Sequence, residues 1–417
     1  MKQKTHYPTK YYIRIIAWLV FTVFAFIFRI KKKMPAEVKN LKSPYLVLGN
    51  HVGHWDPFVT GNFLPHYTHF VSSEAAFRSP FNNFFLTRLG TIPKKKNIRD
   101  TKVIRDIISV IRQGENVGIF PEAVRNWAGS SFTLDPSIVK LIKLLNVPVV
   151  VPILKGMNLF NPRWSAKLRY SRVEVEYELL FKANELKNLS EEEIYSRLSN
   201  ALKHDEVEYQ RTKMNKIYSK YKAENINHAL YVCPDCHAID SFRTKGNDFK
   251  CVECNYDIRI NQFGFFERIS SGKLFFDNIR DWYYWEEKWL LNYVNKKLET
   301  HYEGILFEDK NSQIFVNNEL NQMEYLANAN IKLYVNRIVF EWLEKKEIWT
   351  LKLTDIQTIN PQVNDQLELI YKGKAYRSVG ERPGVSALKW EVAMNALWKK
   401  TGQEHKLSSF IQQELSV

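Results

Sequence analysis

YLVLGNHVGHWDPF, residues 45–58, holds the two features that decide the expected fold. Its first five residues form a continuous apolar run, which is typical of a strand buried on both faces of a parallel sheet. Polar residues, among them His51 and Asp56, follow this run directly. Because sites in open α/β sheets form beyond the carboxyl ends of the strands, the segment predicts a buried strand with a site at its end.

Other segments repeat the pattern of a buried strand. Residues 116–120 (NVGIF) and 147–153 (VPVVVPI) are short apolar runs, and residues 171–181 (SRVEVEYELLF) alternate as a half-exposed edge strand does. Asp135 followed by Pro136 marks the start of a helix. One apolar face of another helix is expected from Val103, Ile104, Ile107, Ile108 and Ile111. Helices that alternate with apolar strands predict a largely parallel sheet.

The remainder of the chain is expected to add smaller parts. A charged helical stretch, residues 190–223, ends the α/β domain. The aromatic-rich residues 282–294 predict a helix that packs against another domain, with a membrane interface as the alternative role. Short β-like runs dominate residues 304–380, and an amphipathic helix begins near Ser386. Many strands closed by one helix resemble a pleckstrin-homology-like domain.

The amino-terminal segment predicts contact with a membrane. The net charge of +15 points to an anionic partner, and ten of the first 42 residues are Lys or Arg against one acid, Glu37. The uncharged apolar run at residues 15–28 would span roughly 21 Å as a helix, whereas a hydrocarbon core needs about 30 Å. The helix therefore spans only if Arg14 and Arg29 snorkel outward, or else it enters one leaflet.

Two other interpretations of this segment stay open. A buried core helix would also be apolar, but basic flanks favour an anionic surface. A signal peptide is disfavoured because RIKKK, residues 29–33, stands where a small-residue cleavage site would be expected.

The four cysteines form two CxxC pairs, Cys233 with Cys236 and Cys251 with Cys254, separated by fourteen residues. This spacing is typical of a zinc ribbon, in which two hooks supply four thiolates to a tetrahedral ion. Without a cleavable signal a reducing compartment is expected, which disfavours the alternative of two disulfides. We expect one structural zinc. We expect no nucleic-acid partner, because the basic residues cluster around the apolar run and not around the cysteines.

His51 and Asp56 form the expected centre of the site. Five residues apart, they would lie on different faces of a continuous helix, so they meet only across a turn, which Gly53 permits. A carboxylate held against an imidazole fixes the tautomer of the ring and stabilises its cation, so the pair can take a proton from a hydroxyl. A histidine near a helix cap, with no chemical role, is the alternative.

A second polar cluster favours the chemical role. Pro121, Glu122 and Arg125 follow the apolar run at residues 116–120, at the equivalent edge of the same predicted sheet. The two clusters are therefore expected to converge on one cleft. The nearby histidines are interpreted as structural, namely His54, His66 and His69.

NHxxxxDPF followed by FPExxR resembles the glycerolipid acyltransferase superfamily, which is typified by 1-acylglycerol-3-phosphate acyltransferase. The resemblance covers about residues 40–180. Four blocks of the family occur in order: residues 51–56, residues 90–96 (GTIPKKK), residues 120–126 (FPEAVRN), and the apolar strand that ends in Val151 and Pro152. The first and third blocks are specific in combination.

The resemblance implies how the chain would act. His51 would deprotonate the acceptor hydroxyl, and Asp56 would orient His51. The hydroxyl would then attack an acyl thioester directly, with no serine or cysteine nucleophile and no catalytic cofactor. The acyl donor would be acyl-CoA or acyl carrier protein, and the acceptor would be a lysophospholipid.

Further residues would bind the acceptor. Glu122 and Arg125 would shape its site, with Arg125 on a phosphate, for which the planar guanidinium is suited. Lys94, Lys95 and Lys96 offer more positive charge, with a solvated basic turn as the alternative.

Three positions depart from the family's pattern. Ala123 and Val124 stand where the family has glycine and threonine, so close backbone approach and a hydroxyl are both lost. Pro93 replaces the usual apolar residue after Ile92. These departures bear on the identity of the acceptor more than on acyl transfer.

The sequence thus predicts an α/β acyltransferase domain with a mostly parallel sheet at residues 36–225, preceded by a membrane-associating helix at residues 1–35. A zinc ribbon at residues 226–262 and a β-rich, pleckstrin-homology-like domain closed by a helix at residues 263–417 would follow. The predicted function is acyl transfer to 1-acylglycerol-3-phosphate in phospholipid synthesis, at the cytoplasmic side of an anionic membrane. The alternative is a catalytically inactive lipid-binding scaffold on the same fold.

Overall fold

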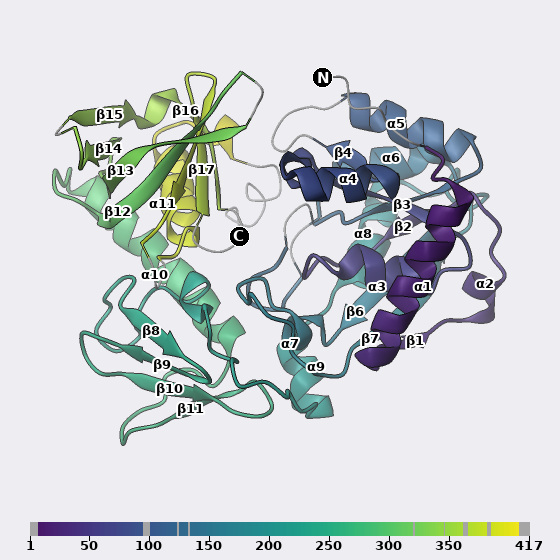
Figure 1. Ribbon diagram of the computed structural model, residues 1–417, viewed down its shortest axis with the longest axis horizontal. Helices are drawn as coiled ribbons and strands as arrows, with labels where there is room; N and C mark the ends of the chain where they lie inside the picture. Colours follow the sequence, from purple (N-terminus) through teal and green to yellow (C-terminus); the bar gives the residue numbers. More distant parts are fainter. Residues whose placement is uncertain are drawn as a thin grey trace. The chain divides into compact units, whose positions relative to one another are not determined.

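The computed structural model describes residues 7–94, 101–122, 125–131, 134–319, 322–345, 347–361, 366–381 and 385–407 (Figure 1). The chain forms two compact units. Unit 1 comprises Met1–Pro162 and Tyr170–Ile217, and unit 2 comprises Arg163–Arg169 and Tyr218–Ser416. The predicted ribbon and the predicted β-rich domain both fall within unit 2.

Unit 1 is built on a seven-stranded sheet with the order β1-β7-β6-β2-β5-β3-β4. The strands β6, β2, β5, β3 and β4 run parallel to one another, whereas β7 is antiparallel to β6. The strands are β1 (Lys31–Lys33), β2 (Leu46–Leu48), β3 (Thr68–Ser73), β4 (Ile92–Lys94), β5 (Asn116–Ile119), β6 (Val149–Lys155) and β7 (Glu174–Phe181). The predicted mostly parallel sheet is confirmed.

Nine α-helices of unit 1 fall within the described residues. They are α1 (Tyr11–Ile27), α2 (Ala36–Lys39), α3 (Asp56–Asn62), α4 (Pro80–Arg88), α5 (Thr101–Arg112), α6 (Ser137–Leu145), α7 (Met157–Phe160), α8 (Glu191–Leu202) and α9 (Glu206–Lys213). The apolar faces of α5, α6 and α8 join β2, β5 and β6 in one hydrophobic core. Val103 and Ile107 of α5 are buried there, as the apolar pattern predicts.

Local signals in the sequence explain where these helices begin. The Asp135 carboxylate accepts a hydrogen bond from the Ser137 amide at 2.9 Å, at the start of α6. Ser190 and Glu193 form a reciprocal capping box at the start of α8. The predicted helical stretch ends earlier than expected, because α9 stops at Lys213.

The prediction that residues 171–181 form an edge strand is wrong. β1 pairs in parallel with β7, with Lys31 opposite Glu174, so β7 has a neighbour on each side there. Three consecutive lysines carry no apolar signal for a strand, and all three are exposed. Lys33 also forms an ion pair of 2.9 Å with Glu174. Backbone pairing to β7, and not side-chain burial, therefore defines β1.

Unit 2 contains two antiparallel sheets. The smaller sheet has the order β11-β10-β9-β8 and the larger has the order β15-β14-β13-β12-β18-β17-β16. The smaller sheet consists of β8 (Phe242–Lys245), β9 (Asp248–Cys251), β10 (Asp257–Ile260) and β11 (Phe266–Arg268). The larger consists of β12 (Phe307–Asn317), β13 (Met323–Leu333), β14 (Arg337–Trp342), β15 (Ile348–Lys352), β16 (Ile356–Pro361), β17 (Gln366–Tyr371) and β18 (Lys374–Val379). Two helices, α10 (Ile279–Glu299) and α11 (Leu388–Lys400), pack against each other.

The β-rich tail closed by a helix is confirmed, with three corrections. β12 begins only at Phe307, and the sequence patterns missed β16 and β18. The expectation that the last helix is amphipathic is wrong, because nearly all residues of α11 are buried between the larger sheet and α10. The interpretation of the aromatic helix as a packing element is confirmed, since Trp282 of α10 is fully buried within unit 2.

One buried side chain joins the strands that hold the site, and it gives a test of the fold. Asn116 of β5 accepts a hydrogen bond from the Tyr45 amide at 3.0 Å and donates one to the Tyr67 carbonyl at 2.9 Å. We expect Asn116→Ala to lower the stability of unit 1 by about 2 to 3 kcal/mol, because two buried backbone groups lose their partner. Hydrogen exchange of peptides from β2 and β5 in urea measures this. Gln113→Ala, at an exposed position after α5, is the control, and equal exchange in both variants would contradict the expectation.

Candidate active site

Neighbouring parallel strands bring the two polar clusters to one edge of the sheet. Leu48, at the end of β2, lies opposite Ile119, at the end of β5. The loops that follow both strands therefore leave the sheet side by side. The Asn50 side chain fixes the first loop, because it donates to the Leu154 carbonyl at 3.1 Å and accepts from the Leu154 amide at 2.8 Å.

His51 and Asp56 are in direct contact across the turn that precedes α3. Nδ1 of His51 lies 2.8 Å from Oδ2 of Asp56. The same oxygen accepts hydrogen bonds from the amides of Val52 at 2.6 Å and Gly53 at 2.8 Å. Asp56 is fully buried, whereas the His51 side chain is 21% exposed. Because the carboxylate only accepts, the hydrogen of the neutral imidazole lies on Nδ1 and the lone pair lies on Nε2.

Gly53 serves this turn through its small size. Its φ is not in the left-handed region, so conformational freedom is not what the position requires. A Cβ at Gly53 would lie 3.3 Å from the carbonyl oxygen and from Oδ1 of Asn161. The turn between His51 and Asp56 is present as predicted, and close approach to Asn161 is the reason for the glycine.

Residues that the sequence patterns did not single out hold His51 in place. The Phe120 ring stacks on the imidazole, with centroids 4.5 Å apart and planes 16° apart, and Phe70 stacks on Phe120. Asn126 donates to the His51 carbonyl from its amide at 3.1 Å and from its side chain at 3.3 Å. Asn50 and Asn126 each stand next to a motif residue, which is the signal that could have identified them.

The second cluster contributes a buried acid and a cation. Glu122 is fully buried, and Arg125 is partly exposed. Burial lowers the pKa of Arg125 to about 10, while the negative charge of Asp56 acts in the opposite direction. Arg125 is therefore a cation at neutral pH, close enough to Asp56 to respond to its charge. Ala123 and Val124 lie outside the described residues.

Lys94 is exposed at the end of β4, at the same edge of the sheet as His51. β5 and β3 stand between β2 and β4, so three strand spacings of ~4.8 Å separate the two strand ends by about 14 Å. Lys95 and Lys96 lie outside the described residues. The structure therefore places four of the predicted site residues in the adjacent segments that follow β2 and β5, namely His51, Asp56, Glu122 and Arg125. Lys94 lies farther along the edge.

The other histidines occupy different surroundings. His54 and His66 are exposed. His69 is buried in β3, where Nδ1 lies 3.0 Å from the Gly90 carbonyl and Nε2 lies 3.8 Å from Glu115. Its contacts are those of a packed structural histidine, away from the strand ends that carry the candidate site.

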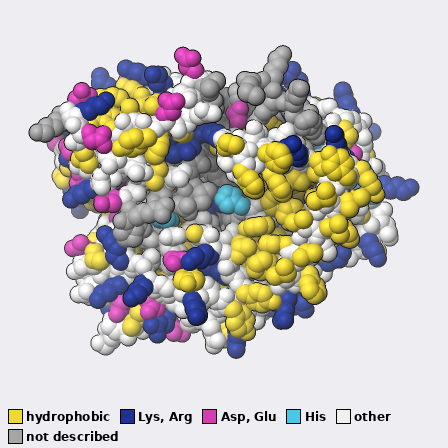
Figure 2. Space-filling model, in the orientation of Figure 1, with side chains coloured by type: hydrophobic (Ala, Val, Ile, Leu, Met, Phe, Trp, Pro, Cys, Tyr) yellow, Lys and Arg dark blue, Asp and Glu magenta, His cyan; other side chains and the backbone are white. Residues whose placement is uncertain are grey.

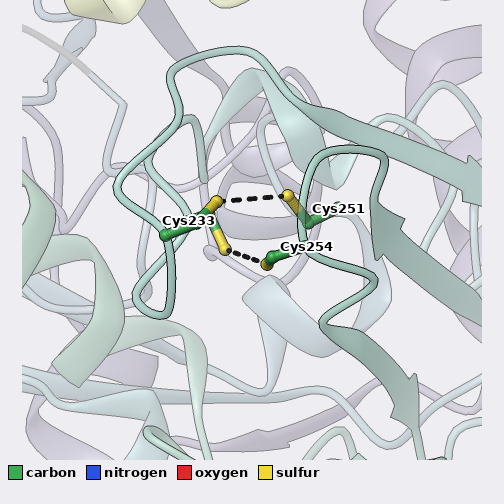
Figure 3. A group of neighbouring side chains, drawn as sticks. Cys233, Cys251 and Cys254 are labelled. Atoms are coloured by element: carbon green, nitrogen blue, oxygen red, sulfur yellow. Dashed lines mark hydrogen bonds between the residues drawn. The ribbon is translucent and has the colours of Figure 1, made fainter.

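The four cysteines lie together in unit 2, and Figure 3 shows the sulfurs facing one another. All four Sγ atoms lie within 4.8 Å of one another. Within the described ranges, no other group of His, Cys, Asp and Glu side chains has this proximity.

Comparisons with known proteins agree with the motifs in unit 1. Residues 27–154 match the family model described as Acyltransferase. A 1-acyl-sn-glycerol-3-phosphate acyltransferase of Borreliella burgdorferi is 28% identical over 102 residues, which are 24% of this chain and 41% of the relative. The match therefore spans less than half the length of that relative.

Two solved structures are also similar. The 1-acyl-sn-glycerophosphate (LPA) acyltransferase PlsC from Thermotoga maritima aligns with 48% of this chain and 80% of its own, at 16% identity and a TM-score of 0.40. The Vps36 N-terminal PH domain aligns with 24% of this chain and 84% of its own, at 17% identity and a TM-score of 0.20. The family match over residues 27–154, together with the motifs, supports an acyltransferase domain in unit 1 that resembles the glycerolipid acyltransferase superfamily.

Proposed function

We propose that this protein transfers a fatty acyl group from an acyl thioester to a hydroxyl of a lysophospholipid, with 1-acylglycerol-3-phosphate as the acceptor, in phospholipid synthesis. One observation carries the proposal: the 2.8 Å contact between His51 Nδ1 and the buried Asp56 carboxylate. The family match over residues 27–154 supports the reaction class. The similarity to the 1-acyl-sn-glycerol-3-phosphate acyltransferase of Borreliella burgdorferi supports the choice of acceptor.

The proposed reaction uses His51 as a general base. The acceptor hydroxyl gives its proton to Nε2, and its oxygen attacks the thioester carbonyl carbon. The C–O bond forms, the C–S bond breaks, and the leaving thiolate takes the proton from Nε2. Asp56 stabilises the imidazolium between these steps, and its own charge is held by the amides of Val52 and Gly53.

This scheme requires neither a covalent acyl-enzyme nor a catalytic cofactor. The imidazole is held on one face by Phe120, which limits the directions from which a hydroxyl approaches Nε2. Both acyl-CoA and acyl carrier protein supply a thioester, and the proposal takes either as donor.

The acceptor phosphate is assigned to Arg125, with Lys94 and Lys96 as further cationic contacts and Glu122 as a residue that shapes the site. Arg125 is a cation on the loop that adjoins His51, and its guanidinium offers paired donors to phosphate oxygens. A phosphate there would place the free glycerol hydroxyl of the same molecule near the imidazole.

The first test of this function is acyl transfer by purified protein, with labelled donors and a panel of lysophospholipids. We expect transfer to lysophosphatidate, and we expect His51→Ala and Asp56→Asn to reduce it by about 10²- to 10⁴-fold, because the general base or its orientation is lost. His66→Ala, at an exposed histidine, is the control and should retain activity. No transfer by the parent protein from either donor, with lysophospholipid binding retained, would favour the inactive scaffold instead.

The second test concerns the acceptor phosphate. We expect Arg125→Gln to raise the KM for lysophosphatidate about 10- to 100-fold, because a charge-assisted contact to phosphate is lost. The exposed Arg105→Gln variant on α5 is the matched control for the loss of one positive charge. If both variants change the KM equally, Arg125 does not bind the acceptor.

The surface of unit 1 supports binding to a membrane, where a lysophospholipid acceptor would be available. No helix among the described parts of the chain is long and apolar enough to cross a bilayer. Apolar side chains gather over α1 and α4 (Figure 2). Highly exposed members of this surface are Tyr11, Trp18 and Phe26 of α1 and Phe81 and Phe84 of α4, with Phe26 83% exposed. Lys31, Lys32 and Lys33 follow α1 and are exposed.

Such a surface suits a helix that lies in the interface of an anionic membrane. Aromatic rings enter the headgroup region and lysines attract anionic lipids at about 1 kcal/mol each. We propose that α1 lies in the membrane in this way, at the cytoplasmic leaflet. The other interpretation, a buried core helix, does not fit α1, in which Ala25 is the buried residue.

Flotation with anionic vesicles tests the membrane proposal. We expect the double variant Trp18→Glu and Phe26→Glu to bind vesicles at least about tenfold more weakly, because two aromatic side chains no longer enter the lipid. Leu144→Glu on α6, where the leucine is 60% exposed, is the control for a charge placed on exposed apolar surface. Equal flotation of the parent protein and the α1 variant would contradict the proposal.

A further inference from the structure

The first cysteine pair lies in a tight hook of unit 2. The His237 amide donates to the Cys233 carbonyl at 2.9 Å, and the Cys233 amide donates to the Ala238 carbonyl at 3.0 Å. His237, which follows Cys236 directly, is left-handed with φ of 62°. These bonds turn the chain back on itself, so Cys233 and Cys236 project to the same side.

The second cysteine pair repeats this geometry. The Asn255 amide donates to the Cys251 carbonyl at 3.2 Å, and the Cys251 amide donates to the Tyr256 carbonyl at 2.8 Å. Asn255, which follows Cys254, is left-handed with φ of 63°. Two separate segments thus adopt the same hook, with equivalent backbone hydrogen bonds and a left-handed residue directly after the second cysteine.

The spacing between the hooks fits a metal ion. Cys233 Sγ lies 3.6 Å from Cys254 Sγ, and Cys236 Sγ lies 3.7 Å from Cys251 Sγ (Figure 3). Four thiolates at about 2.3 Å from a tetrahedral zinc lie about 3.8 Å from one another. A disulfide would require about 2.05 Å between sulfurs.

Backbone amides also face the sulfurs. Those of Asp235 and Cys236 lie within hydrogen-bonding reach of the Cys233 sulfur, and those of Glu253 and Cys254 face the Cys251 sulfur. Amide donors around thiolates are the outer contacts that orient metal ligands. Two of the four sulfurs, those of Cys233 and Cys251, thus have amide donors of the kind that a metal-bound thiolate accepts.

We propose that Cys233, Cys236, Cys251 and Cys254 hold one structural zinc, and that this zinc also stabilises the larger sheet of unit 2 and α11. The second part follows from two sets of contacts that connect the hooks with the rest of unit 2. The free energy of zinc binding would then stabilise the larger sheet and α11 as well as the ribbon.

The first set connects the start of the first hook with α10. Glu286 of α10 is fully buried, and its Oε2 accepts hydrogen bonds from the amides of Tyr231 at 2.8 Å and Val232 at 3.0 Å. The indole of Trp282 donates to the Val232 carbonyl at 3.1 Å. The residues directly before Cys233 are therefore fixed to α10 by three hydrogen bonds.

The second set connects the segment between the hooks with α11 and β12. Asp240 accepts a hydrogen bond from the Ser386 amide at 3.1 Å and forms an ion pair with Lys389 of α11. Lys389 is fully buried and pairs also with Asp309 of β12, which accepts a hydrogen bond from the Trp390 indole at 2.7 Å. A buried lysine cation is stable only while carboxylates balance its charge, and Asp240 and Asp309 do so for Lys389. Displacement of Asp240 would leave Asp309 alone to balance that charge.

Asp240 is held by the hooks themselves. It lies between Cys236 and Cys251, and its left-handed φ of 54° and the hydrogen bond of its amide to the Tyr231 carbonyl set its direction.

Protein contacts also join the second hook to the segment that carries Asp240: the Val252 amide donates to the Ser241 carbonyl at 2.9 Å, and Phe242 pairs with Cys251 between β8 and β9. Without the ion these contacts alone would hold the two hooks together, and we expect the position of Asp240 to loosen. The expected result is loosening of α11 and β12, far along the chain from the cysteines.

Two measurements on the full chain test the proposal. Elemental analysis of protein purified without chelator should give one zinc per chain, and the double variant Cys236→Ser and Cys254→Ser should give none. Lys250→Ser, at an exposed position of β9, should keep its zinc. Absence of zinc from the parent protein, or iron in its place, would overturn the metal assignment whether or not the variants fold.

Hydrogen exchange with and without chelator tests the coupling. Removal of zinc should speed amide exchange about tenfold or more in β8 to β11 and also in α11 and β12, while β2 and β5 of unit 1 keep their protection. Lys389→Met, which replaces the buried cation, should keep its zinc but lose the response of α11. A parent protein that holds zinc but shows no change in α11 on chelation would overturn the coupling.

Discussion

The site depends on a buried carboxylate whose charge is held by three hydrogen bonds to one oxygen. Asp56 Oδ2 receives the Nδ1 hydrogen of His51 and the amides of Val52 and Gly53. A buried carboxylate without such donors would be costly, so the backbone between His51 and Asp56 must turn to supply them. This requirement explains the spacing of the motif. The same bonds set the tautomer that leaves Nε2 with a lone pair for the acceptor hydroxyl.

The sheet of unit 1 makes this arrangement possible. β2 and β5 are adjacent and parallel, so the loop of His51 and the loop of Glu122 and Arg125 leave the same edge. Hydrogen bonds of Asn50 connect the first loop to β6, and those of Asn126 connect it to the second loop. The proposed reaction, in which His51 takes a proton from the acceptor and returns it to the leaving thiolate, depends mainly on fixed positions for the base and the acceptor. In unit 2, the hydrogen-bonded cysteine hooks and the buried ion pairs of Lys389 fix positions in addition to the apolar core.

The sequence predicted the parts that follow from local patterns. Apolar runs identified β2, β5 and β6, and the periodicity of Val103 and Ile107 identified α5, because buried positions are occupied by apolar residues. The strand of Lys31, Lys32 and Lys33 has no apolar residues that would predict it, since it is defined by backbone pairing with β7. α11 looked amphipathic because a buried lysine, Lys389, is indistinguishable in sequence from an exposed one until Asp240 and Asp309 are seen beside it. The motif residues His51 and Asp56 were found by spacing, whereas Phe120 and Asn126 act through contacts between distant segments that spacing does not encode.

In the proposed mechanism, His51 and Asp56 promote direct transfer from thioester to hydroxyl in one ternary complex. Initial rates of acyl transfer, measured over a grid of donor and acceptor concentrations, distinguish this mechanism from a covalent one. We predict measurable transfer with intersecting double-reciprocal lines, because both substrates must be bound before the hydroxyl attacks. Parallel lines would indicate a covalent acyl-enzyme and would contradict the role assigned to His51, as would the absence of transfer at every point of the grid.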